Sequence, residues 1–142
     1  MNLLEELKDK NYALIASNGY FSFDNGIKPV ISKINEKRDY FKELIVADKI
    51  VGKASAMLLT LSGVKEVYCV VLSKAGKDIL ESNNIQYHYE ELVDNIINRK
   101  GDDICPMEKT VKDIDDFEEA LKALNEKVKL LANAWFASNL LA

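Results

Sequence analysis

The chain of 142 residues has little cysteine, histidine and proline. Two cysteines exclude a disulfide-rich scaffold, and the six glycines, which follow no repeat, exclude a collagen-like or low-complexity chain. Cys69 lies within an apolar run typical of a buried strand, where a small side chain packs well. The single histidine, His88, and two distant cysteines give no zinc-like ligand spacing. We therefore expect no metal and no cofactor.

Charge of neither sign dominates, since 19 Lys and Arg residues face 23 Asp and Glu residues for a net charge of -4. Such a chain has no general attraction to nucleic acid or anionic lipid, so neither partner is expected. The longest charge-free stretch, 130–142, is shorter than the roughly 20 residues of a membrane-spanning helix. The first residues are acidic, unlike a secretory signal, which predicts a cytoplasmic location.

The hydrophobic pattern predicts one α/β domain over residues 1–142. Asn18-Gly19 tolerates the positive φ angles of a tight turn, so 12–17 and 20–23 are expected to form an antiparallel hairpin. The alternation that follows predicts later strands running parallel, with helices on the faces of the sheet. The other expected elements are helices near 3–7, near 30–34 with Pro29 in the first turn, over 46–61, 74–81 and 90–98, strands over 64–72 and 85–89, and two helices after Pro106.

The C-terminal segment 113–142 is predicted to be a long helical extension. Its apolar residues recur at steps of three and four, as in a coiled-coil seam. One interpretation is a homodimer formed through this helix, and the other is a helix that packs on its own chain. The seam consists of Ile114, Phe117, Leu121, Leu124, Val128, Leu131 and Trp135.

The start of the expected 46–61 helix is the first candidate site. Helix N-termini present unpaired N–H groups and the positive end of the dipole, which suits an anion. Lys49 and Lys53 would repel one another one turn apart unless Asp48 or a ligand phosphate or carboxylate lay between them. Gly52 costs roughly 1 kcal/mol in mid-helix against Ala, which close approach of a ligand or a strand would explain. The alternative is a solvated edge with extended lysines.

The segment Cys105-Pro106-Met107-Glu108 is the second candidate site. Proline at the first helical position places Cys105 at the N-cap, where the dipole favours the thiolate and hence a nucleophile. Glu108 matches the second half of a capping box, but could also act as a general acid or base. Asn98 and Arg99 are expected to end the preceding helix and could bind an anion. A purely structural cap at Cys105 is the alternative.

These motifs, taken in order, resemble a known family. Gly26-Ile27-Lys28-Pro29, the run Val46 to Ala54, Asn98-Arg99 and Cys105 to Glu108 are similar to the uncharacterised bacterial and archaeal domain of unknown function 1893. The resemblance covers roughly residues 12–112 and leaves the final helix outside. It implies a fold similar to that of the cytidine deaminases, a three-layer α/β/α sandwich, and the expected element order agrees with it. The predicted fold is thus such a sandwich, with a mixed sheet, an N-terminal hairpin and, outside the resemblance, a long C-terminal helix.

The resemblance does not extend to zinc-deaminase chemistry. Those enzymes need a His or Cys two residues before a catalytic Glu, then Pro-Cys-x-x-Cys, and neither occurs near Asp48 to Lys53 or Ser73 to Gly76. The first functional hypothesis is a zinc-independent enzyme acting on a small anionic metabolite or nucleotide-like ligand. The second is a non-catalytic binding module, and the third is an interaction protein that dimerises through its last helix. The catalytic candidates are Cys105, Lys53, Asp48 and Glu108, and the ligand-binding candidates are Lys49, Gly52, Asn98 and Arg99.

Overall fold

Five strands form one open, mixed sheet in the computed structural model, which describes the backbone of residues 2–141 and the side chains of residues 2–137. The three later strands run parallel, and β1 runs antiparallel to both of its neighbours, which confirms the predicted hairpin. The order across the sheet is β2 (Phe21–Ser22), β1 (Leu14–Ala16), β3 (Ile45–Val51), β4 (Glu66–Ser73) and β5 (Gln86–Val93).

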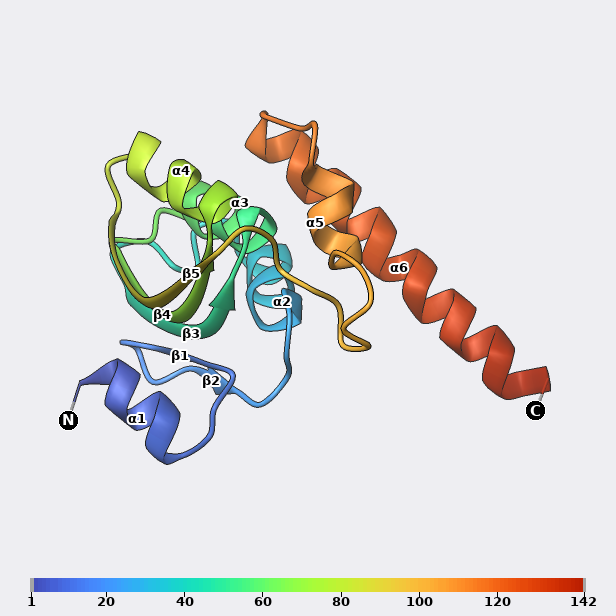
Figure 1. Ribbon diagram of the computed structural model, residues 1–142, viewed down its shortest axis with the longest axis horizontal. Helices are drawn as coiled ribbons and strands as arrows, with labels where there is room; N and C mark the ends of the chain where they lie inside the picture. Colours follow the sequence, from blue (N-terminus) through green and yellow to red (C-terminus); the bar gives the residue numbers. More distant parts are fainter. Residues whose placement is uncertain (1, 142) are drawn as a thin grey trace.

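Helices cover both faces of this sheet, so the predicted α/β/α class is confirmed (Figure 1). Helix α1 packs on one face, where its Leu7 meets Ile15 and Ala47 in a small cluster. The main core lies on the other face and includes residues of α2, α3 and α4, with α5 and α6 added at its side. The helices are α1 (Leu3–Asp9), α2 (Lys28–Glu36), α3 (Lys53–Leu61), α4 (Lys74–Ser82), α5 (Pro106–Val111) and α6 (Phe117–Leu141).

Local signals fix where several helices begin. The Asn2 side chain accepts a hydrogen bond from the Glu5 amide, and the Glu5 carboxylate returns to the Asn2 amide, closing a capping box on α1. Ser73 caps α4 in the same way by accepting from the Gly76 amide at 3.0 Å. Pro29 lies in the first turn of α2 and Pro106 opens α5, as their fixed φ angles predict.

The predicted helix over 46–61 is wrong in its first half. Residues Ile45–Val51 form β3, Gly52 is the N-cap, and α3 begins only at Lys53. Most of β3 is buried, because strands lie on both sides of it and helices on both faces, so its apolar residues on either side of Asp48 and Lys49 show no period-two alternation. Its valines and isoleucines favour a strand, although their spacing also fits a helix.

The predicted helix over 90–98 is also wrong. Strand β5 does not end at Tyr89 but continues to Val93, because β4 offers pairing partners as far as Ser73. Residues 94–105 then form a loop, closed by an isolated antiparallel bridge between Ile97 and Ile104. Asn98 and Arg99 therefore lie in this loop and do not end a helix.

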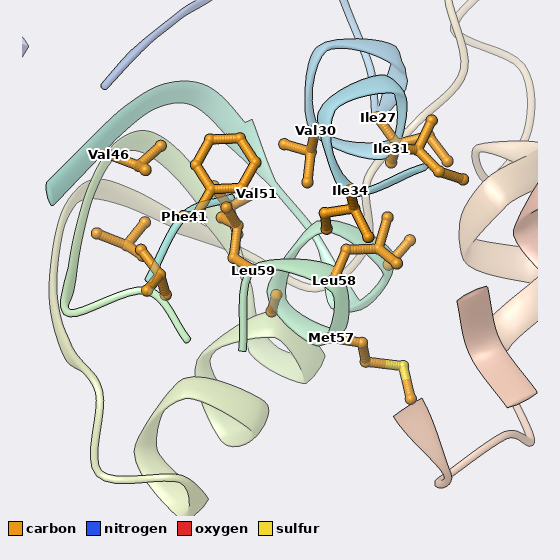
Figure 2. Close-up of a cluster of buried hydrophobic side chains, with 14 of the residues drawn as sticks. Ile27, Val30, Ile31, Ile34, Phe41, Val46, Val51, Met57, Leu58 and Leu59 are labelled. Atoms are coloured by element: carbon orange, nitrogen blue, oxygen red, sulfur yellow. The ribbon is translucent and has the colours of Figure 1, made fainter. Parts of the chain in front are cut away.

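The main core is a layer of aliphatic side chains between β3, β4 and the helices above them. Figure 2 shows Val30, Ile31 and Ile34 of α2 facing Leu58 of α3, all of them buried. Removing such apolar area from water supplies about 25 cal/mol per Å² and is the main stabilising contribution to the fold. The sheet and α3 consequently form a rigid support for the loops at their ends.

Helix α6 divides into two halves with different surroundings. Leu121 and Leu124 in its first half are buried in the main core, so this part of the predicted seam packs within the chain. The second half extends away from the sheet (Figure 1), and there Leu131 is 43% and Trp135 65% exposed. Among the described residues, no helix is long and apolar enough to cross a membrane.

This division predicts different costs for truncating the two halves of the seam. We expect Leu124→Ala to lower the free energy of unfolding by about 2–5 kcal/mol, because it leaves a cavity in the core. Leu131→Ala, measured in the same urea titration, should cost less than about 1 kcal/mol in the single chain. Equal losses would show that the two leucines have equivalent surroundings.

Candidate functional site

A cleft of about 820 Å³ opens beyond the carboxyl end of β3. It lies between the N-terminal ends of α2 and α3, the loop 94–105, the start of α5 and the second half of α6. Its walls are mainly aliphatic, which is typical of small-molecule sites. The apolar lining includes Ile27, Ile50, Ile96, Ile97, Met107 and Leu131.

The N-terminus of α3 is occupied by a side chain from a distant part of the sequence. The Glu108 carboxylate of α5 accepts hydrogen bonds from the Lys53 amide at 2.7 Å and from the Ala54 amide at 2.8 Å. A carboxylate there satisfies two donors that the helix leaves unpaired and lies at the positive end of its dipole. Since Gly52 supplies no capping side chain, Glu108 takes over that role across the fold.

The absence of a side chain at Gly52 makes room for this contact. A Cβ atom built there would lie 2.1 Å from Oε1 of Glu108 and 2.8 Å from Cγ1 of Ile96, both far inside contact distance. The sequence predicted close approach of a ligand or a strand to Gly52, whereas the groups that approach it are Glu108 of α5 and Ile96 of the loop 94–105. The capping box predicted for Glu108 is wrong, because the Cys105 amide donates instead to the Ile96 carbonyl at 2.9 Å.

The structure gives Lys49 and Lys53 separate partners. The Lys49 ammonium donates to Oδ1 of Asn11 at 2.7 Å, and the Lys53 ammonium donates to the Lys112 carbonyl at 3.0 Å. The one-turn spacing expected for them is wrong, because Lys49 belongs to β3 and Lys53 begins α3. Neither lysine lines the cleft, and both amines are held by groups outside it.

Asp48 is buried in β3, with 5% of its surface exposed, opposite Leu14 of β1 and Cys69 of β4. Its Oδ1 accepts a hydrogen bond from the Ile50 amide at 3.3 Å, and its Oδ2 has no partner among the described residues. Burial raises the pKa of this carboxyl from 3.8 to about 7, against the opposing effect of the Ile50 and Lys49 amides. The expected role of orienting the lysines is not supported by any contact to their ammonium groups within the described chain.

The two cysteines are free thiols in different surroundings. Cys69 is buried in β4, as predicted, and its thiol donates to the His88 carbonyl at 3.3 Å. Burial, with a smaller contribution from Asp48, raises the pKa of Cys69 to about 12, so its thiolate is disfavoured at neutral pH. Cys105 is half-buried at the N-cap of α5 and lines the cleft.

The loop 94–105 forms the polar rim of the cleft. The Asn98 side chain accepts from the amides of Gly101 and Asp102 and donates to the Asp102 carboxylate, so it shapes the loop. Arg99 and Lys100 of this loop and Lys28 of α2 line the cleft as exposed cations.

The cleft-lining carboxylates are held by other groups. Asp102 is bonded to Asn98, Asp103 pairs with Lys109, and Glu108 is bound by the α3 amides. In the described part of the chain, none of the cations Lys28, Arg99 and Lys100 has an ion-pair partner. Of these, only Arg99 was a candidate from sequence, although Lys28 lies in one of the motifs quoted for the resemblance. The described residues also include no group of three or more His, Cys, Asp or Glu placed to hold a metal ion.

The domain of unknown function DUF1893 matches residues 2–128. The chain belongs to the DUF1893 family. This match is longer than the sequence motifs suggested, since it includes α1 and about the first half of α6. The chain is also similar to the crystal structure of a DUF1893 family protein from Thermotoga maritima, with 28% identity, a TM-score of 0.79, and coverage of 87% of this chain and 86% of that one. No curated protein matches it.

The contact between Gly52 and Glu108 in this DUF1893 protein predicts non-additive mutations. Gly52→Ala should lower the free energy of unfolding by about 1–3 kcal/mol, because its methyl group overlaps the carboxylate. Glu108→Ala should cost a similar amount, since two helix donors lose their partner. In the double variant the overlap between the new methyl group and the Glu108 carboxylate is gone. The measured loss of unfolding free energy should therefore fall short of the sum of the two single losses by about 1 kcal/mol or more.

Urea denaturation of the four proteins measures this coupling, with Glu91→Ala on the exposed part of β5 as the matched control. The control should cost little and should add independently to Gly52→Ala. Strict additivity of Gly52→Ala and Glu108→Ala would contradict the assigned contact.

The buried Asp48 predicts a contribution to stability that falls as the pH rises. Its pKa is about 7 in the folded state and 3.8 when unfolded, so the folded state holds the proton more tightly between these values. Stability from this group is complete below about pH 4 and is lost as the pH rises through 7. Asp48→Asn removes the titration, so the difference in unfolding free energy between variant and wild type should grow in favour of the variant from pH 5 to pH 8. Parallel pH profiles would show that Asp48 is ionised throughout.

Proposed function

We propose that this protein binds a small molecule in the cleft at the end of β3, and that the ligand joins an apolar body to a carboxylate or phosphate group. The observation that carries the proposal is the pairing of aliphatic walls with cations that have no ion-pair partner among the described residues. Ile50, Ile97 and Met107 supply apolar contact, and Arg99 and Lys100 lie on the rim.

The positions of the charges support an anionic ligand. An arginine guanidinium recognises carboxylates and phosphates with two parallel hydrogen bonds, and neighbouring lysines add attraction without fixing geometry. The cleft-lining carboxylates already have partners, so they compete little for Lys28, Arg99 and Lys100. An anion at the rim would therefore pair with cations that these carboxylates do not neutralise.

The ligand's charge is assigned to the rim and not to the α3 N-terminus. Glu108 already fills the position where an external anion would meet the Lys53 and Ala54 amides. A second anion there would be repelled by the carboxylate, which replaces the lysine-centred site expected from the sequence.

Catalysis is the second candidate, favoured by the thiol of Cys105 in the same cleft as Arg99. In this form of the proposal, Arg99 holds the ligand anion and the Cys105 thiol adds across a carbonyl group of the ligand. The new S–C bond replaces the carbonyl π bond, and the thiol proton passes to the carbonyl oxygen. Glu108 is less suited to move a proton than the sequence suggested, because both of its oxygens accept amide hydrogen bonds. We also propose, on the sequence resemblance, a fold of the cytidine deaminase type, which the mixed sheet with helices on both faces supports.

Binding is tested with three probes of known composition: octanoate, octanol and inorganic phosphate. Octanoate should raise the melting temperature more than octanol or phosphate at equal concentration, because it engages walls and rim together. A ligand at 100 times its Kd stabilises the folded state by about 2.7 kcal/mol. Octanoate should also slow alkylation of Cys105, while buried Cys69 remains unreactive and serves as an internal reference.

Charge-neutral variants locate the anion. The double variant Arg99→Gln with Lys100→Gln should reduce the advantage of octanoate over octanol, and Lys65→Gln should not. Lys65 is the matched control because it is exposed just before β4, at the opposite end of the parallel strands. Equal stabilisation by octanoate and octanol, or an octanoate effect unchanged in the rim variant, would overturn the proposal. Turnover that disappears in Cys105→Ser while octanoate still binds would favour the enzyme over the binding module.

A further inference from the structure

The second half of α6 carries apolar side chains outside the core of its own chain. Leu131 is 43% and Trp135 65% exposed, and Leu130 and Phe136 are 63% and 58% exposed. Residues 130–142 include no Asp, Glu, Lys or Arg. Several exposed apolar side chains along one charge-free helical segment are typical of an interaction site in a folded protein.

Leu131 and Trp135 continue the row that attaches α6 to the rest of the molecule. Phe117, Leu121, Leu124 and Val128 recur at steps of four, three and four, and they pack against the main core. Leu131 and Trp135 extend this series by further steps of three and four, beyond the point where α6 leaves the sheet (Figure 1). A 3.5-residue repeat keeps one face of a helix directed at a partner helix. The exposed part of the row has this repeat, so it is suited to packing against a helix in the same way as the buried part.

We infer that this DUF1893 protein forms a two-fold symmetric dimer in which the second halves of two α6 helices pack antiparallel along Leu131 and Trp135. The occupant is a second copy, because the surface is a direct continuation of the helix-packing interface already present within the chain. Self-pairing buries the same row on both subunits at once, as a two-fold interface requires.

The antiparallel direction follows from where the body of the protein lies. Up to Val128, the row is covered by the chain's own core. A parallel partner helix would have to occupy that space, because its own first half would lie alongside. An antiparallel partner places its body beyond the C-terminal end of the first α6, past the exposed Leu131 and Trp135.

The dimer would also place the partner's α6 beside the cleft. Leu131 belongs both to the exposed row and to the lining of the cleft, and Ile97 beside the same opening is half exposed. The C-terminal end of the partner's α6, running back toward Val128, therefore passes the cleft opening. The inference stands on the helix row alone and does not rest on the proposed ligand.

Leu130 and Phe136 supply matched controls on the same helix. If Leu131 and Trp135 occupy the inner d and a positions of a heptad, Leu130 and Phe136 fall at c and b, which face away from a two-stranded partner. All four residues are exposed in the single chain, so a charge at any of them leaves its folded core intact. Only the two inner positions should matter for assembly.

The test is sedimentation equilibrium of the full chain from 1 to 100 μM, with circular dichroism as the check on folding. Wild type should be a dimer, Leu131→Glu and Trp135→Glu should raise the dimer dissociation constant at least 100-fold, and Leu130→Glu and Phe136→Glu should change it less than threefold. A monomeric wild type at 100 μM overturns the inference. Equal weakening by all four substitutions also overturns it, since that pattern belongs to non-directional apolar association, as does binding to phosphatidylcholine vesicles by a monomeric chain.

Discussion

The carboxylate of Glu108 on the N-terminus of α3 is the interaction on which the arrangement of the cleft depends. It links residues 108 and 53, which are far apart in sequence, and so holds α5 against the end of the sheet. The loop 94–105 is fixed at both ends, by β5 on one side and by α5 on the other. Glycine is the only residue type that leaves room at position 52 for both the Glu108 carboxylate and Ile96. The shape of the cleft therefore follows from one charged contact and one missing side chain.

This contact also decides how charge is distributed in the cleft. The positive end of α3 is neutralised from within the chain, so the floor of the cleft has little electrostatic attraction for an anion. The cations at the rim are exposed and have no ion-pair partner in the part of the chain that the structure describes, so any attraction for an anion comes from them. Attraction between exposed groups weakens as salt rises, whereas contact with the aliphatic walls does not. If a small ligand binds in this cleft as proposed, both contributions act on it.

Much of the fold could be predicted from local sequence signals. Asn18-Gly19 marked the hairpin, Pro106 marked the start of α5, and the apolar run around Cys69 marked β4. Strand β3 was missed because a strand covered on both faces loses its alternation, and its apolar residues happened to match a helical spacing. Gly52 was correctly noticed as unusual, but a mid-helix position was the wrong context for it.

The candidate site was harder to predict because its contacts are not local. The amines of Lys49 and Lys53 bind Asn11 and the Lys112 carbonyl, and no spacing rule connects such distant residues. Glu108 was assigned to its nearest helix by a local capping pattern, whereas its partners lie on α3. Cys105, Arg99 and Gly52 do line one cleft, since short segments at strand and helix ends converge there in α/β folds.

Helix α6 carries a single apolar row that runs from the core to the cleft and to the proposed dimer surface. Its first part is satisfied by the chain's own core, and the family match ends at residue 128, close to where this packing ends. Leu131 then faces both the cleft and the surface assigned to a second copy. If a ligand contacts Leu131 differently in the monomer and the dimer, its affinity must depend on assembly. By thermodynamic reciprocity the ligand must then change the dimer affinity by the same factor. Because α6 contributes both to the lining of the cleft and to the proposed dimer surface, it is sufficient to couple ligand affinity to dimer affinity. No change in the sheet is required.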